Sequence, residues 1–135
     1  MSKDDPVDYI IDDILTPKDK YEIMCLGFSF PSSETFEEFI HSYKLVPNVS
    51  DTVYKKLGFG VFNGCYSYHT RLKTPDNYPE SFTFEVDEDR TEILSVSVLD
   101  ENFLQPTYVS KDTYKQIKEF MDSLVEAGIL TKGDD

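Results

Sequence analysis

Apolar residues recur at intervals of three and four along three segments of the chain, which predicts helices over residues 6–15, 34–45 and 111–127. This spacing places apolar side chains on one face of a helix, where they are buried together. A shorter helix is predicted over residues 50–57, because Gly58 supplies the left-handed residue that ends many helices.

Capping residues support the boundaries of the three main helices. Asp5 precedes the first helix, Ser33 the second and Ser110 the third. Such side chains accept hydrogen bonds from the free backbone N–H groups of a first turn. Gly128 follows the last helix in the position of a left-handed C-terminal cap, and Ile129 is placed for the hydrophobic contact that accompanies it.

Two other segments alternate between apolar and polar residues, which predicts strands. The first covers residues 21–30. The second runs over residues 59–99 with turns at 74–77 and 87–90, so it predicts a three-stranded antiparallel meander, with a bulge near its glycines. The pattern places Phe62, Tyr66, Tyr68 and Leu72 on one face of the first, long strand and Val61, Cys65 and His69 on the other. The apolar face of the second strand carries Phe82, Phe84 and Val86, and that of the third carries Leu94, Val96 and Val98.

These elements predict a single α+β domain over residues 1–135. Its sheet is expected to be mainly antiparallel, made of the meander at about 59–99 and a strand at about 21–30. The helices at about 6–15, 34–45 and 111–127 are expected to pack on this sheet. Residues 132–135 are expected to fray at the end of the chain.

Composition agrees with a folded protein of the cytoplasm. Hydrophobic residues make up 39% of the chain and aromatic residues 14%, which is enough for a core without cross-links. The only cysteines, Cys25 and Cys65, are expected to be free thiols in a reducing compartment. The longest apolar run, 23–26, is too short to span a membrane. The acidic N-terminus lacks the basic and apolar regions of a secretory signal.

The charge of the chain is strongly negative and unevenly distributed. Its 26 acidic residues outnumber 13 basic ones, for a formal net charge of −13. Residues 1–38 carry −7 and residues 76–109 carry −8, whereas residues 39–75 carry +4. A surface of this kind repels nucleic acid and anionic lipid and attracts basic proteins. We therefore expect a basic protein partner, with no direct binding of nucleic acid or membrane.

Motifs for catalysis or cofactor binding do not accompany this charge. Cys65 and His69 lie four residues apart on a predicted strand, about 13 Å from each other, whereas a catalytic dyad needs about 3 Å. A tertiary contact of Cys25 with His41 or His69 stays open. Metal-ligand and phosphate-loop spacings are missing from the sequence. We expect a protein that is not an enzyme and that needs no cofactor and no metal.

The acidic stretch from residue 80 to residue 101 is the candidate binding surface. Charges on adjacent strands are expected to add in one region of space and to speed association with a basic partner. Tyrosine is a favoured anchor at interfaces. A solvated sheet face of ordinary composition is the alternative interpretation. The predicted partner-binding residues are Tyr78, Asp87, Glu88, Asp89, Glu92, Asp100 and Glu101.

The segment Val98-Leu99-Asp100-Glu101-Asn102-Phe103-Leu104-Gln105-Pro106, within the stretch Leu94–Pro106, resembles segments of small bacterial immunity proteins. These proteins protect cells from the toxin domains of polymorphic or contact-dependent toxin systems. The resemblance covers about a tenth of the chain. It implies a cytosolic protein that binds one toxin domain, and it assigns no residue roles.

The leading hypothesis is a non-enzymatic immunity protein that inhibits a basic, nuclease-type toxin domain by covering its active site. Negative charge placed where phosphates bind would block such a site. Two alternatives remain. One is a DNA-mimic inhibitor of a host defence or DNA-binding protein. The other is a small ligand-binding or regulatory domain, which would require a deep apolar cavity between the helices and the sheet.

Overall fold

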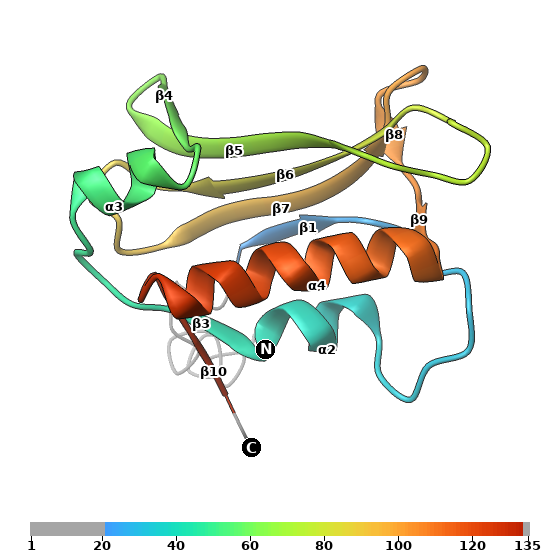
Figure 1. Cartoon of the computed structure of the whole chain (residues 1–135), viewed down its shortest axis with the longest axis horizontal. Helices are drawn as coiled ribbons and strands as arrows, with labels where there is room; N and C mark the ends of the chain where they lie inside the picture. Colours follow the sequence, from blue (N-terminus) through green and yellow to red (C-terminus); the bar gives the residue numbers. More distant parts are fainter. Residues whose placement is uncertain (1–20, 134–135) are drawn as a thin grey trace, which may run out of the picture.

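The computed structural model describes residues 21–133, which form an α+β fold of three helices, one mixed six-stranded sheet and two small two-stranded sheets (Figure 1). The predicted α+β class is therefore confirmed. The predicted helix over residues 6–15 lies outside the described residues. Among the described helices, none has the length and apolar character needed to cross a lipid bilayer.

The main sheet contains the predicted meander. Its strands follow the order β1-β7-β6-β5-β4, and β8 pairs with part of β7. All neighbouring strands are antiparallel except β1, which runs parallel to β7. The strands are β1 (Glu22–Met24), β4 (Gly60–Phe62), β5 (Cys65–Leu72), β6 (Glu80–Val86), β7 (Ile93–Asp100) and β8 (Gln105–Pro106).

The first part of the meander is a hairpin rather than one long strand. Asn63 and Gly64 separate β4 from β5, and both have positive φ values, 54° and 82°. Two successive residues of positive φ form the tight turn that matches the twist of a hairpin. The expected bulge is therefore a chain reversal. Phe62, predicted to share a strand face with Tyr66, is instead 70% exposed beside Val61, whereas Tyr66 is buried.

The strand predicted over residues 21–30 is broken in the middle. β1 ends at Met24, and a second short strand, β2 (Gly27–Phe28), pairs in parallel with β9 (Tyr108–Val109). Gly27 has a φ of +114°, a conformation that side chains rarely adopt, so the chain changes direction here. Leu26 consequently points away from the core and is exposed.

The helix predicted over residues 34–45 is shorter than expected. Helix α2 (Phe36–His41) begins at Thr35, whose side chain caps it in place of Ser33. Its C-terminal continuation is strand β3 (Tyr43–Leu45), which pairs antiparallel with β10 (Leu130–Lys132). The expected fraying of the chain end is therefore wrong for Lys132. The apolar residues that recur at helical spacing in this segment are buried: Phe36, Phe39, Ile40 and Tyr43.

The other two helices match their predictions closely. Helix α3 (Asp51–Lys56) follows Ser50 and is ended by Gly58, whose φ is +102°. Helix α4 (Lys111–Glu126) begins at Ser110, whose side chain accepts a hydrogen bond from a first-turn N–H group. The C-terminus of α4 is closed at Gly128, whose φ is +87°, and by a hydrogen bond from the Ile129 N–H group to the Leu124 carbonyl.

Helix α4 covers one face of the sheet, and α2 lies on the same side of the sheet (Figure 1). Phe120 of α4 stacks on Tyr68 with ring centroids 4.3 Å apart, and it also contacts Phe82 and Phe84. Phe39 of α2 meets Tyr114 of α4 at 5.0 Å. Aromatic side chains therefore fill the space between the sheet and α4. The positions that alternate with these core residues are mostly polar and belong to the opposite face of the sheet: Ser67, His69, Arg71, Ser81, Thr83, Glu85, Ser95 and Ser97.

Candidate functional site

The predicted partner-binding residues fall into two groups at opposite ends of the β6–β7 hairpin. Glu80 pairs with Asp100 at one end of this hairpin, and Val86 pairs with Ile93 at the other. At about 3.3 Å per residue, the two ends lie roughly 23 Å apart. The expectation of one continuous acidic region is therefore wrong. Asp87, Glu88, Asp89 and Glu92 form the first group, and Tyr78, Asp100 and Glu101 form the second.

The first group occupies the turn between β6 and β7, and Asp87 holds this turn together. Its carboxylate accepts hydrogen bonds from the Thr91 N–H group at 2.8 Å, the Thr91 hydroxyl at 3.0 Å and the Glu92 N–H group at 3.2 Å. These bonds satisfy the carboxylate within the turn. Glu88 and Asp89 remain exposed at its tip.

Arg90, the only base of the acidic segment, ties this turn to helix α3. Its Nε–H donates to the Val49 carbonyl at 2.7 Å, and its Nη1–H donates to the Tyr66 hydroxyl at 3.1 Å. The Tyr66 hydroxyl in turn donates to Asp51 in α3, and this bond is the main cause that lowers the pKa of Asp51. At this end of the sheet, Arg90, Asp51 and Asp87 are therefore engaged in hydrogen bonds within the protein.

The second group is organised by Asp100, at the end of β7. One carboxylate oxygen accepts a hydrogen bond from the Tyr78 hydroxyl at 2.7 Å. The other accepts from the N–H groups of Asn102 at 2.8 Å and Phe103 at 3.3 Å. The Asp100 carbonyl also accepts from the Leu104 N–H group at 2.7 Å. One residue therefore fixes both the turn from β7 to β8 and the ring of Tyr78.

This turn presents two large apolar side chains to solvent. Phe103 is 67% exposed and Leu104 is 76% exposed, and Leu104 has a φ of 54°. A non-glycine residue in this region of backbone space costs about 1–2 kcal/mol. We call Tyr78, Asp100, Glu101, Phe103 and Leu104 the turn surface. Sequence reasoning missed Phe103 and Leu104, although adjacent apolar residues in an irregular polar stretch are a usable signal.

Carboxylates surround the turn surface. Glu80 lies directly opposite Asp100 across the strand pair, an arrangement that like charges make unfavourable. Burial raises the pKa of Glu80, and the nearby charges of Asp76 and Asp100 raise it further. Glu101 accepts two hydrogen bonds from Arg71, at 3.0 and 2.7 Å. These four acids outnumber the single arginine, so this end of the sheet keeps an excess of negative charge.

The residues considered for nucleophilic chemistry do not form a dyad. Burial raises the pKa of the Cys25 thiol to about 11, so this thiol is protonated at neutral pH. The ring of His69 lies instead beside the Thr83 hydroxyl, at 2.9 Å, and beside Glu101, at 3.7 Å. Within residues 21–133, no group of three histidine, cysteine or acidic side chains is arranged to hold a metal ion.

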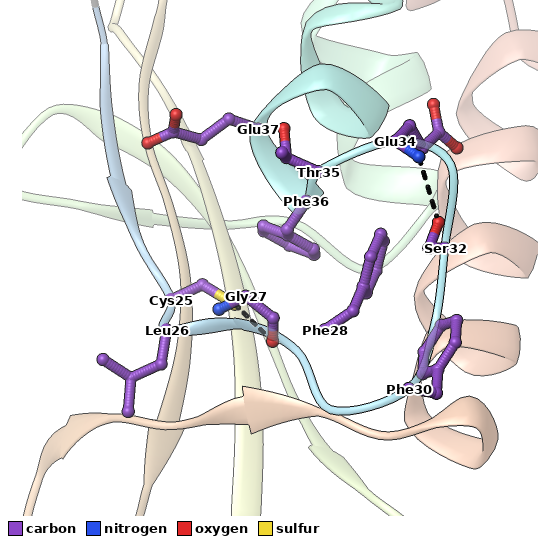
Figure 2. A pocket seen from close by; sticks show the side chains of 10 residues that line it. All are labelled: Cys25, Leu26, Gly27, Phe28, Phe30, Ser32, Glu34, Thr35, Phe36 and Glu37. Atoms are coloured by element: carbon purple, nitrogen blue, oxygen red, sulfur yellow. Dashed lines mark hydrogen bonds between the residues drawn. The ribbon is translucent and has the colours of Figure 1, made fainter.

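A pocket of 370 Å³ lies at the edge of the molecule, between β2 and the start of α2 (Figure 2). It is not the deep cavity between helices and sheet that a ligand-binding domain of the predicted kind requires, because aromatic side chains fill that space. Its lining includes Cys25, Phe36, Glu34 and Glu37.

Comparison with known proteins supports the fold alone. No family model and no curated protein matches this sequence. Among solved structures, the chain is similar to a DUF1831 family protein from Lactobacillus plantarum, whose crystal structure was determined at 1.20 Å resolution. The TM-score is 0.57 and the sequence identity is 20%, and the match covers 80% of this chain and 96% of the other. At this identity the likeness concerns architecture and not activity.

Proposed function

We propose that this protein is a non-enzymatic binding protein of the cytoplasm whose turn surface docks on a basic protein partner. The supporting observation is the combination of exposed apolar side chains and surrounding carboxylates at the end of the β6–β7 hairpin. Large apolar side chains that are held rigidly in solvent are typical of interaction sites. Phe103 and Leu104 meet this description, and Asp100 fixes the backbone that carries them.

The charges around the turn surface favour a basic partner. Negative potential steers a positively charged protein into encounter, while apolar anchors at the centre of the contact supply most of the affinity. Tyr78, held by Asp100, adds an aromatic ring to the same surface.

The partner that we propose is a toxin domain, most readily a nuclease, whose active site the turn surface covers. The segment that resembles immunity proteins forms the end of β7, the turn and β8, so it coincides with this surface. A DNA mimic fits less well. Duplex DNA carries one negative charge per about 1.7 Å along its axis, whereas the predicted acids here form two groups separated by roughly 23 Å.

A co-expression experiment tests the proposal. The search is for a large secreted toxin encoded beside this gene, and the toxin domain found there is expressed with the wild-type protein or with the double variant Phe103→Ser/Leu104→Ser. Wild-type protein is expected to restore growth. Loss of two apolar anchors is expected to weaken binding of the purified domain about a hundredfold. The matched control is Val61→Ser/Phe62→Ser, which removes similarly exposed apolar side chains at the other end of the sheet.

The control variant is expected to bind like the wild type. Equal loss of binding in both double variants would reject the turn surface as the contact. Absence of such a toxin gene, or failure of the wild-type protein to protect, would reject the immunity function. Association that does not slow with added salt would reject the electrostatic part.

A further inference from the structure

The pocket between β2 and the start of α2 is lined by aromatic rings and by two glutamates, Glu34 and Glu37 (Figure 2). The rings of Phe28 and Phe36 point into it, whereas Leu26 points away from it. Glu37, in the first turn of α2, lines the pocket on the side of Cys25. The complete lining is Cys25, Leu26, Gly27, Phe28, Phe30, Ser32, Glu34, Thr35, Phe36 and Glu37.

The aromatic walls are held in place by ring contacts. Phe28 meets Phe36 edge-to-face at 5.8 Å between ring centroids, and it meets Phe30 at 4.8 Å. Tyr114 of α4 supports both Phe28 and Phe30, at 5.3 and 5.8 Å. These contacts link the pocket to the packed interior, so little ordering is needed when a ligand enters.

The charge of the pocket is negative. Glu34 and Glu37 are acidic, and the lining contains no lysine, arginine or histidine. No ion pair joins either glutamate to a base within residues 21–133. The Cys25 thiol adds no charge, because burial and the nearby carboxylates of Glu37 and Glu80 keep it protonated. Within this described part of the chain, the two glutamates, unlike Asp87 and Asp100, have carboxylates that accept no hydrogen bond from the protein.

The pocket lies on the same edge of the molecule as the turn surface. The Leu26 N–H group donates to the Thr107 carbonyl at 2.9 Å, between β8 and β9. β8 pairs with β7 at Leu99 and Asp100, directly beside the turn. A partner that covers Phe103 and Leu104 is therefore placed to reach the pocket as well.

We infer that this pocket receives an arginine side chain of the basic partner. The inference rests on the proposed function because the basic partner supplies the arginine, whereas the chemistry of the pocket is independent of that function. A guanidinium group is weakly hydrated and planar, so it stacks on phenylalanine rings while it donates hydrogen bonds to carboxylates. The methylene stem of arginine covers apolar surface at the same time. Phe28, Phe30 and Glu37 are the expected contacts.

A titration with a small probe tests the pocket without the partner. The probe is N-acetyl-arginine methylamide, and its uncharged counterpart is N-acetyl-norleucine methylamide. Binding is followed by amide chemical shifts in two-dimensional NMR spectra of the full chain at low salt. The arginine probe is expected to shift amides of residues 25–30 and 34–37 and to bind at least about fivefold more tightly than the norleucine probe.

Three variants separate the contributions. Glu34→Gln/Glu37→Gln is expected to weaken arginine binding about fivefold, since each solvated ion pair contributes little. Glu88→Gln/Asp89→Gln removes the same charge from the distant turn and is expected to leave the affinity unchanged. Phe30→Leu keeps an apolar wall and is expected to weaken the arginine probe more than the norleucine probe. The NMR spectrum of each variant reports whether it is folded.

The inference is overturned if the arginine probe causes no localised shifts, if both probes bind equally, or if the two double variants lose affinity equally. Each of these results leaves the toxin experiment with the turn surface unaffected. Conversely, localised arginine binding together with failed protection from the toxin would retain the pocket and reject the proposed function.

Discussion

Arg90 offers the sharpest test of how the acidic turn is stabilised. Its guanidinium donates to the Val49 carbonyl at 2.7 Å and to the Tyr66 hydroxyl at 3.1 Å, and its central carbon lies 5.5 Å from the centroid of the Tyr66 ring. Hydrogen bonds of charged groups contribute about 1.5–3 kcal/mol each, and solvent replaces part of this at a partly buried site. Arg90→Ala is therefore expected to lower the free energy of unfolding by about 2–3 kcal/mol.

The backbone at this position makes a second substitution informative. Arg90 has a φ of 59°, in the left-handed region, where a side chain costs about 1–2 kcal/mol. Alanine keeps this cost, and glycine removes most of it. Arg90→Gly is therefore expected to be about 1 kcal/mol more stable than Arg90→Ala, although both lack the guanidinium.

Urea unfolding followed by far-ultraviolet circular dichroism measures both free energies. Arg71→Ala is the control, because Arg71 likewise donates two hydrogen bonds, in its case to the Glu101 carboxylate, but its side chain is 71% exposed. Its loss is expected to cost less than about 1 kcal/mol. The reasoning is refuted if Arg90→Ala is no more destabilising than Arg71→Ala, or if the glycine variant is less stable than the alanine variant.

Two further predictions concern buried polar groups. Tyr54→Phe is expected to leave the free energy of unfolding unchanged or to raise it slightly, because the buried Tyr54 hydroxyl has no hydrogen-bond partner among the described residues. Tyr43→Phe breaks a 2.8 Å hydrogen bond to Asp122 and is expected to lower the free energy of unfolding by about 1–2 kcal/mol in the same urea assay. Glu80→Gln is expected to raise the melting temperature at about pH 7 and to have little effect at about pH 3. The pKa of Glu80 in the folded protein is raised above the 4.5 of a free glutamate. The protonated side chain therefore stabilises the fold fully below about pH 4.5, and this stabilisation is lost as the pH rises through the pKa of the folded state. An equal effect of the substitution at both pH values would contradict this cause.

Elements with strong local patterns were predictable from the sequence. Helix α4 matches its prediction because apolar spacing, the Ser110 cap and the Gly128 C-terminus all act within a few residues. Strands β6 and β7 match because alternating residues report burial on one face, and Val96 and Val98 are fully buried as expected. Leu94 is exposed instead, since the register shifts between Glu85 and Val86.

Elements that depend on distant partners were not predictable in this way. The helical pattern of residues 34–45 continues through Tyr43, but residues 43–45 form a strand because Leu130–Lys132 pairs with them. Likewise, β1 joins the sheet in parallel with β7, which lies some seventy residues away. Pairing of this kind depends on contacts between residues far apart in the chain, and a local pattern of apolar residues carries no information about them.

The composition of the candidate site was likewise predictable from the sequence, whereas its arrangement in space was not. Sequence alone determined which residues are acidic, that the segment 76–109 carries a large negative charge, and that Tyr78 belongs to it. Tertiary contacts separate these acids into two groups, join Tyr78 through Asp100 to the turn of Phe103, and bring Glu37 and Phe28 to one pocket. The reason is that the spacing of residues reports burial within one element, whereas a surface is assembled from several elements whose pairing depends on contacts far apart in the chain.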